Sequence, residues 1–369
     1  MKKICMVATS FLDYDSRILN EANTLAKFYD LTILTKKYNR PTILQSTSFK
    51  IKRVYYSQGW LRWYNIFSSL IALTIATFKE NPDVYHAHDL DGLICAYWPA
   101  LIKKKILIYD SHELWSDLWS AKKYKIQWLL RIIERIAMWK VEKGVTVSRS
   151  LARILSGMYQ KQFVTISNYP VLHCAKTTVY NLGDKYTGMT IVLHIGTMSN
   201  GRGIENLIEA NQYLPTNFLI VFLGTFNNID RLINLVKEKH LEKRVIFKAS
   251  VGDDQLLSIA RMANIGVVLT QNLSLSYYYS LPNKLFQYIA AEIPILASDL
   301  PTQKAIILED KIGQVVDSSQ PRQIAAKIME LAKPENQKKY RQNLKGLAKR
   351  KYNWTIESKK LVEFYKTIV

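Results

Sequence analysis

The chain is poor in cysteine, and its cysteines form no pattern. Cys5, Cys95 and Cys174 are the three in 369 residues, and their spacing matches neither a metal site nor a disulfide framework. This usage indicates a reducing compartment. A GxGxxG sequence is also missing after the first apolar run, where residues 9–13 read TSFLD, so a nicotinamide dinucleotide cradle is not expected.

Long hydrophobic runs are scarce as well. The first apolar run spans about seven residues and lacks a small-residue cleavage site, so it predicts a strand rather than a signal peptide. Residues 63–78 carry no charge, but they are fewer than the roughly 20 apolar residues that a membrane span needs. We expect a buried helix there, with an interfacial start.

Acidic residues are outnumbered, with 30 Asp and Glu against 51 Lys and Arg, for a net charge of +21. The excess is spread over both halves of the chain, so it belongs to folded surface. Such a surface attracts phosphates on nucleic acid, on an anionic membrane or on a substrate. Zinc-finger spacing, aromatic RNA-binding signatures and long basic runs are missing, and we therefore expect no nucleic-acid partner.

Apolar runs separated by helical patterns are what the chain has in abundance. In the first half they are residues 4–8, 31–34, 84–87, 106–109, 145–147 and 163–166. In the second half they are residues 191–195, 218–223, 244–248, 265–269, 293–297 and 313–316. Parallel strands need crossover helices, so this alternation predicts an α/β fold with two doubly wound, Rossmann-like domains. We place the domains at residues 1–170 and 189–350, joined by a linker at 169–188, and expect ligands in the cleft between them.

Two segments of the second domain have the chemistry of an anion site. Asn283 and Lys284 open an amphipathic helix behind Pro282, where free backbone amides favour a phosphate. Residues 196–203, GTMSNGRG, approach a P-loop, but Arg202 stands where its lysine belongs and no Ser or Thr follows. A magnesium-dependent NTPase is therefore disfavoured, and we infer a nucleotide sugar as ligand. The alternative is a plain strand-to-helix turn with a solvated arginine.

Several motifs resemble glycosyltransferase family 4, which contains retaining sugar transferases with the two-domain GT-B fold. LHIGTMSNGRGIENLIEA, NKLFQYIAAEIPILASDLP and NWTIESKKLVEFYK are similar to the family's carboxyl-terminal domain. VYHAHDLDG, IYDSHELW, VTVSRSLA and ISNYP are similar to its first domain, in the expected order. The resemblance covers nearly the whole chain and implies an enzyme of the bacterial surface-polysaccharide type. It also implies a C-terminal helix at residues 351–369 that crosses back to the N-terminal domain.

The resemblance implies a donor site with departures from the family pattern. Thr197 replaces one of two cations that hold the donor diphosphate and Arg202 replaces the other, so we expect Arg202 and Lys284 to act together. Tyr279 and Gln287 replace two paired glutamates, and backbone amides of residues 279–281 are expected to substitute for the first. The implied donor-binding residues are Gly196, Thr197, Arg202, Tyr279, Ser280, Leu281, Asn283, Lys284 and Gln287.

The resemblance also implies catalytic residues in the first domain. His112 is similar to a family histidine that faces the donor sugar, where a neutral imidazole can position a hydroxyl. Glu113 follows it and suits an oxocarbenium-like centre, although each residue has a plainer alternative, a local hydrogen bond for His112 and a helix cap for Glu113.

The expected acceptor-binding residues are Asp13, Asp15, Arg17 and Asp89. A helix cap with a solvated arginine is the alternative for the first three. His88 and Asp89 follow another strand, with structural roles equally open.

The implied reaction moves a hexose from a nucleotide diphosphate to an acceptor hydroxyl, with retention at the anomeric carbon. Cations and helix dipoles stabilise the leaving diphosphate, so no metal or other cofactor is expected. The sole near-match to a DxD metal motif is Asp89-Leu90-Asp91. A noncatalytic GT-B partner subunit would explain the missing glutamates, and a sugar-nucleotide epimerase of the same fold is the other alternative.

Two segments of the first domain, residues 60–67 and 122–140, combine aromatic and basic residues. Their pattern fits either an interfacial helix on an anionic membrane or a core helix with a solvated basic face. The first alternative predicts a lipid-linked saccharide acceptor. It also predicts a cytoplasmic protein that is peripheral on the inner face of the plasma membrane.

Overall fold

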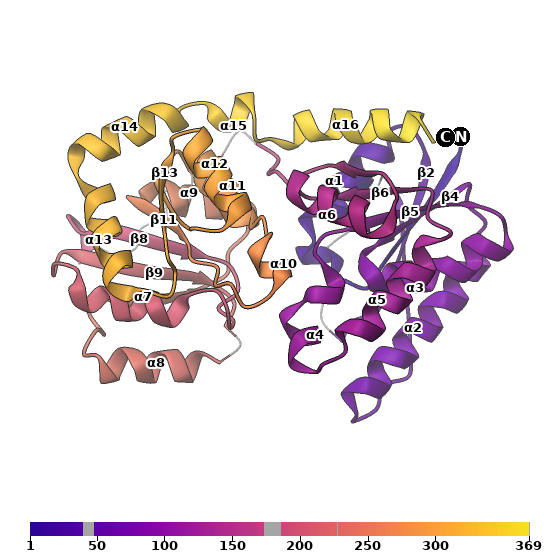
Figure 1. Ribbon diagram of the computed structural model, residues 1–369, viewed down its shortest axis with the longest axis horizontal. Coiled ribbons are helices and arrows are strands. Elements are labelled where there is room, and N and C mark those ends of the chain that lie inside the picture. The colour runs from indigo at the N-terminus through magenta and orange to yellow at the C-terminus, as the bar shows by residue number, and fades with distance from the viewer. Residues whose placement is uncertain (40–47, 173–185, 227, 369) are drawn as a thin grey trace. The chain divides into compact units, whose positions relative to one another are not determined.

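The computed structural model describes residues 1–39, 48–172, 186–226 and 228–368. The chain divides into two units, Met1–Asn168 together with Trp354–Val369, and Tyr169–Asn353. Within the expected linker, residues 173–185 lie outside the described residues. Each unit is a parallel sheet covered by helices (Figure 1), which confirms the predicted fold class of two Rossmann-like domains.

Unit 1 holds a seven-stranded sheet in the order β3-β2-β1-β4-β5-β6-β7. Its strands are β1 Lys3–Ala8, β2 Asp30–Lys36, β3 Lys50–Val54, β4 Val84–His88, β5 Ile106–Ser111, β6 Lys143–Thr146 and β7 Phe163–Thr165. Its helices are α1 Ser16–Leu25, α2 Arg62–Lys79, α3 Asp89–Ile102, α4 Trp119–Lys123, α5 Gln127–Met138, α6 Arg149–Tyr159 and α16 Trp354–Lys366. The strand order reverses between β1 and β4, and in such sheets ligands bind beyond the carboxyl ends of the strands at this point.

The alternation of side chains along β1 explains the two cores of unit 1. Cys5 and Val7 pack with residues of α2, α3, α5 and α6, whereas Ile4 and Met6 pack with residues of α1 and α16. Because Tyr365 of α16 is fully buried in the second core, the C-terminal helix is an integral part of unit 1.

Unit 2 holds a six-stranded sheet in the order β10-β9-β8-β11-β12-β13. Its strands are β8 Thr190–Ile195, β9 Phe218–Gly224, β10 Val245–Ala249, β11 Ile265–Val268, β12 Ile295–Ser298 and β13 Gly313–Val316. Its helices are α7 Ile204–Ala210, α8 Ile229–Glu238, α9 Asp253–Met262, α10 Leu275–Tyr278, α11 Asn283–Ala291, α12 Pro301–Glu309, α13 Pro321–Ala332, α14 Pro334–Leu344 and α15 Leu347–Arg350. All seven residues of β9 are buried, as its continuous apolar run FLIVFLG predicts.

Two features differ from the sequence prediction. Edge strand β3 reads KIKRV, and its alternating lysines hid it from a search for apolar runs. Helix α2 is not buried along its length, because Trp63, Phe67 and Ile71 are all more than half exposed.

Candidate active site

Two basic side chains meet at the carboxyl end of β8 in unit 2. Gly196 follows β8 with a φ of 111°, and a Cβ there would lie 3.6 Å from Cε of Lys284. Nζ of Lys284 is 2.8 Å from Nε2 of His194. Burial, reinforced by the positive charge of Arg202, holds the pKa of Lys284 well below its usual value. Burial and the same two cations also depress the pKa of His194, so a neutral imidazole accepts from Lys284. An anion bound here would raise the pKa of Lys284 again.

Arg202 is held near this pair by the turn before α7. Its backbone N–H donates to the Ser199 carbonyl over 3.3 Å, and its guanidinium lies over the Tyr277 ring, 5.2 Å from the centroid. The alternative of a solvated arginine is therefore wrong, since Arg202 is half-buried on an aromatic ring. Thr197 is exposed, and its hydroxyl accepts a hydrogen bond from Thr225 over 3.1 Å.

The expected backbone donors of residues 279–281 are largely occupied. The N–H of Tyr279 donates to the Leu275 carbonyl over 3.0 Å, and that of Ser280 donates to the Tyr277 carbonyl over 3.2 Å. These bonds close the turn after α10, so the expectation that all three amides face a ligand is corrected for Tyr279 and Ser280, and for Leu281 it stays a prediction.

The other expected donor residues lie on α11. Asn283 is its first residue and is exposed, and Gln287 lies one turn further along the helix, on the same face as Lys284. Their ligand contacts stay predictions. Behind them, Tyr288 fixes α11 against β8, because its hydroxyl accepts from the Ile195 N–H and donates to the Leu193 carbonyl, each over 2.9 Å.

A buried carboxylate that the sequence did not single out organises the corresponding edge of unit 1. Asp110, near the end of β5, accepts from Nε and Nη2 of Arg17 over 2.8 and 2.7 Å. Its Oδ2 is also 3.1 Å from Nε2 of His112 and 3.3 Å from Nδ1 of His88. Burial alone would raise the pKa of Asp110, but the charges of Arg17 and His112 outweigh it and hold that pKa well below the usual range.

His112 lies between two carboxylates. Its Nδ1 is 3.2 Å from Oδ2 of Asp89, and its Nε2 contacts Asp110. Burial lowers the pKa of His112, but Asp89 and Asp110 more than compensate and raise it to about 9. The expectation of a neutral imidazole is therefore wrong, because at neutral pH the ring is an imidazolium with both N–H groups directed at carboxylates.

Three of the expected acceptor residues have structural roles. Asp15 caps α1 by accepting from the Ile18 N–H over 3.2 Å. Arg17 is 2% exposed, so it is neither solvated nor open to an acceptor while its guanidinium holds Asp110 and the Ile166 carbonyl. Asp89 positions His112, and its Oδ1 also accepts a hydrogen bond from the His112 backbone N–H over 3.0 Å. Asp13 is half-buried in the short turn before α1.

Glu113 is exposed beside His112. The cap residue of the helical turn that follows, Trp115–Asp117, is Leu114, and both roles considered for Glu113 stay predictions.

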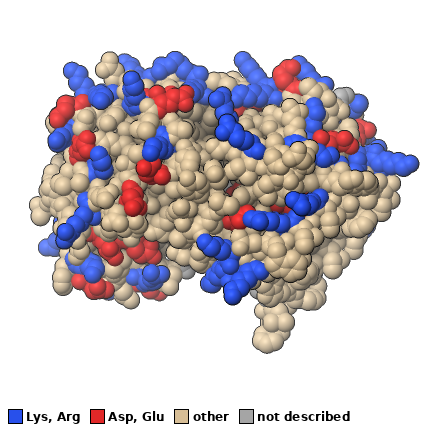
Figure 2. Space-filling model, viewed as in Figure 1, with Lys and Arg blue, Asp and Glu red and all other residues tan. Residues whose placement is uncertain are grey.

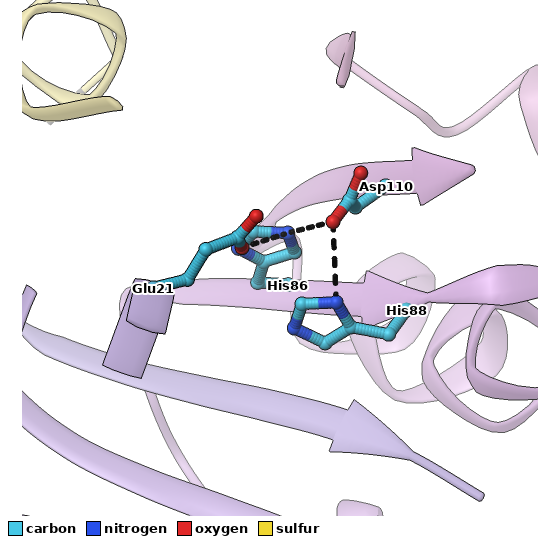
Figure 3. Close-up of side chains that lie close together, drawn as sticks. All are labelled: Glu21, His86, His88 and Asp110. Atoms are coloured by element: carbon cyan, nitrogen blue, oxygen red, sulfur yellow. Dashed lines mark ion pairs between the residues drawn. The ribbon is translucent and has the colours of Figure 1, made fainter. Parts of the chain in front are cut away.

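Four buried side chains, Glu21, His86, His88 and Asp110, place one ligand atom each within 4.8 Å of one another (Figure 3). Such a set resembles a metal site, but Nη2 of Arg17 lies 3.2 Å from Oε1 of Glu21 and already supplies a positive charge. Burial and Asp110 raise the pKa of Glu21 to about 8 despite Arg17. The sequence gives one weak signal for this cluster, the spacing of Glu21 one helical turn after Arg17.

The C-terminal helix completes the cluster. The hydroxyl of Tyr365 is 2.7 Å from Nδ1 of His86, and burial first, then the neighbouring imidazole of His88, lowers the pKa of His86 well below its usual value. His86 also stacks on His88, with ring centroids 4.4 Å apart.

Two family models match the chain, one described as Glycosyltransferase Family 4 over residues 16–168 and one as Glycosyl transferases group 1 over residues 183–351. Among solved structures, a sucrose-phosphate synthase from Thermosynechococcus elongatus is similar, with 16% identity, a TM-score of 0.79 and coverage of 100% of this chain and 99% of that chain. Anabaena HepE in complex with UDP-glucose gives 11% identity, a TM-score of 0.75 and full coverage of both chains. WaaG, a glycosyltransferase involved in lipopolysaccharide biosynthesis, gives 13% identity, a TM-score of 0.67 and coverage of 97% of this chain and 98% of that chain. No curated protein matches. At these sequence identities the similarity to solved structures shows the fold alone.

Proposed function

We propose that this chain, a glycosyltransferase with the GT-B fold, moves a hexose from a nucleotide-diphosphate sugar to a saccharide or lipid-linked saccharide, with retention at the anomeric carbon. The observation that carries the proposal is the pair of Lys284 and Arg202 at the carboxyl end of β8. The positive charge of Arg202 lowers the pKa of the buried Lys284, and an anion bound beside both side chains, such as a diphosphate, would offset their charges.

The donor is the better supported half of the reaction. HepE has been solved with UDP and with UDP-glucose, which makes uridine sugars the first donors to test. In our proposal Arg202 and Lys284 stabilise the leaving diphosphate, Gln287 contacts the nucleotide ribose, and Asn283 and the Leu281 amide lie beside the phosphates. Because both positive charges come from the protein, the proposed chemistry requires no divalent metal.

Unit 1 supplies the residues proposed for the sugar. In our proposal His112 lies beside the donor sugar as a cation whose two N–H groups are held by Asp89 and Asp110, so that it acts through its positive charge on an oxygen that gains negative charge. Glu113 offers an exposed carboxylate to an oxocarbenium-like centre, and Asp13 contacts the acceptor. Arg17 acts beneath this surface by positioning Asp110, and Glu21 lies against Arg17.

The acceptor and the cellular setting complete the proposal. We propose a role in surface glycan biosynthesis, carried out by a cytoplasmic protein that is peripheral on the inner face of the plasma membrane. The likeness to WaaG, which acts in lipopolysaccharide biosynthesis, and the basic, aromatic surface of unit 1 support it.

The test is donor turnover by the purified chain. UDP-glucose and its GDP, ADP and dTDP counterparts are incubated with the protein, nucleotide release is followed by chromatography, and the anomeric configuration of the product is read by NMR. We expect release with one donor and a retained anomer. An inverted anomer would contradict retention, and binding without release would favour the partner-subunit alternative, which the replacement of both glutamates by Tyr279 and Gln287 keeps open.

A further inference from the structure

One helical layer of unit 1 exposes large apolar side chains to solvent. Five of the eight tryptophans are exposed, and all five lie within residues 60–139. The exposed large apolar side chains of this layer are Trp60, Leu61, Trp63, Tyr64, Phe67, Ile71, Ile75, Trp98, Ile102, Tyr124, Trp128, Leu129, Ile132, Ile136 and Trp139. Single exposed apolar residues are ordinary, but a contiguous group of this size marks an interaction surface.

These side chains form stripes along the outer sides of neighbouring helices. On α2 they recur every four residues from Trp63 to Ile75, and on α5 they recur from Trp128 to Ile136. The opposite sides of the same helices face the core through Leu73 and Met138, so the stripes face outward. Helix α3 packs against both α2 and α5. The stripes therefore belong to one surface, the outer face of α2, α3 and α5.

Basic side chains surround this surface, and acidic ones are few. Residues 119–140 contain six Lys or Arg and one acidic residue, Glu134. Glu134 is buried and accepts a hydrogen bond from the Tyr109 hydroxyl. Lys123, Lys125 and Arg135 are exposed beside the stripe of α5. Figure 2 shows a broad area without charged groups over α2 and α5, with Lys and Arg at its edge near α4.

A basic hollow of about 320 Å³ adjoins the far end of α5. Trp139 lines it together with Lys104, Lys140 and Lys161, and among the described lining residues Glu142 alone is acidic, 3.3 Å from Nζ of Lys140. The hollow is of a size and charge to take a phosphate headgroup next to the apolar stripe.

We propose that the outer face of α2, α3 and α5 docks on a bilayer surface that contains anionic lipid. Tryptophan-rich stripes with flanking lysines match the boundary between acyl chains and headgroups, where indole rings lie at headgroup level and ammonium groups reach phosphates. A protein partner would fit this face only if its own surface were both apolar and acidic. None of the helices in the described ranges is long and apolar enough to span a bilayer.

The docking surface deepens the proposed function, because it would bring unit 1 to a lipid-linked acceptor, and that link rests on the proposed function. The binding itself needs neither donor nor acceptor. A protein that binds vesicles but turns over no sugar would leave the docking surface standing, and a protein that turns over sugar but binds no vesicle would leave the enzyme standing.

The experiment is vesicle flotation of the full chain. Vesicles of phosphatidylcholine alone are compared with an equal mixture of phosphatidylcholine and phosphatidylglycerol, at low and high NaCl. We expect binding to the mixed vesicles that weakens with salt. The double change Trp128→Gln and Ile132→Gln should reduce the partition coefficient by about tenfold or more, since it removes two apolar anchors. The pair Lys125→Gln and Arg135→Gln should reduce it by about tenfold or more on the mixed vesicles alone.

The matched control is Leu308→Gln with Met329→Gln, which removes two exposed apolar side chains from unit 2. It should bind vesicles like the wild type, and all variants should keep the wild-type Tm. Absence of wild-type binding to the mixed vesicles would overturn the proposal, as would an equal loss in the control. A dimer in light scattering that dissociates in the α5 variant, without vesicle binding, would assign the face to a second copy of the chain instead.

Discussion

The charge of His112 offers the sharpest test of the unit 1 site. The change Asp89→Asn keeps the shape of the side chain and removes one of the two carboxylates that flank the imidazole. We expect the pKa of His112 to fall from about 9 toward about 7, so that the ring becomes largely neutral at slightly alkaline pH.

The magnitude follows from the geometry. Unit charges 3.2 Å apart attract by about 5 kcal/mol at an effective dielectric constant of about 20. The Asp89 side chain is 24% exposed, and solvent screening together with the retained amide oxygen should leave about half of that energy as the difference. About 2.7 kcal/mol corresponds to about two pKa units.

The same charge contributes to stability. The folded-state pKa of His112 lies above the ordinary 6.5, so its contribution is complete below pH 6.5 and is lost as the pH rises through about 9. A shift of this size is worth about 3 kcal/mol, and in Asp89→Asn most of this pH dependence should disappear.

The assay is an NMR titration of ¹⁵N-labelled histidines, with the His112 signal identified by its loss in His112→Gln. The control is Asp91→Asn, two residues further along α3, whose carboxylate accepts from Thr9 and does not contact His112. A pKa that stays within about half a unit of the wild-type value in Asp89→Asn, or an equal fall in Asp91→Asn, would refute the argument.

Three further tests concern other parts of the chain. Folding raises the pKa of Glu21 from 4.5 to about 8, so the wild-type protein loses stability as the pH rises from about 4.5 to about 8. Glu21→Gln should flatten this pH dependence, and urea denaturation at the two ends of that pH range measures the free energy of unfolding. Lys284→Met should weaken UDP binding by about tenfold or more, because it removes one of the two basic side chains at the end of β8; isothermal titration calorimetry measures the affinity, and unchanged binding would contradict this. Gly203→Ala should lower stability by about 2 to 4 kcal/mol, because φ is 68° and the new Cβ would lie 2.4 Å from the Leu269 carbonyl oxygen, whereas Gly157→Ala on α6, with open space around it, should be neutral or stabilising in thermal unfolding.

Most of the fold follows from local sequence, because buried parallel strands are continuous apolar runs. The exception, β3, pairs with β2 at the sheet edge, where one face meets solvent and lysines alternate with apolar residues. Helix α11 ends before Glu292, whose φ of 59° is a conformation that favours glycine. The Glu292 side chain accepts from the Gly346 N–H over 2.8 Å, which compensates for the lack of glycine.

The candidate residues of unit 1 and those of unit 2 differ in how far the sequence could predict them. Lys284 and Arg202 were found because each stands in a local motif, a helix start and a glycine-rich turn. Asp110 was missed, because its role depends on the β4 to β5 register, which places His88 opposite it. Tyr365 was missed for a similar reason, since it contacts His86 across 279 positions of the chain.

The charge balance of the unit 1 cluster links its titrations to one another. Below the pKa of Glu21 the cluster holds two cations, Arg17 and His112, against two carboxylates, Asp110 and Asp89, and Glu21 is neutral. When Glu21 ionises, a third negative charge appears in a buried region, and each of the two cations then holds its proton more firmly. The imidazolium of His112 lowers the pKa of Glu21 in turn, so the two groups titrate as a coupled pair. The alkaline limit of His112 as a cation is therefore a property of the whole cluster, and Glu21→Gln should lower it although Glu21 lies beneath the surface that meets the substrate.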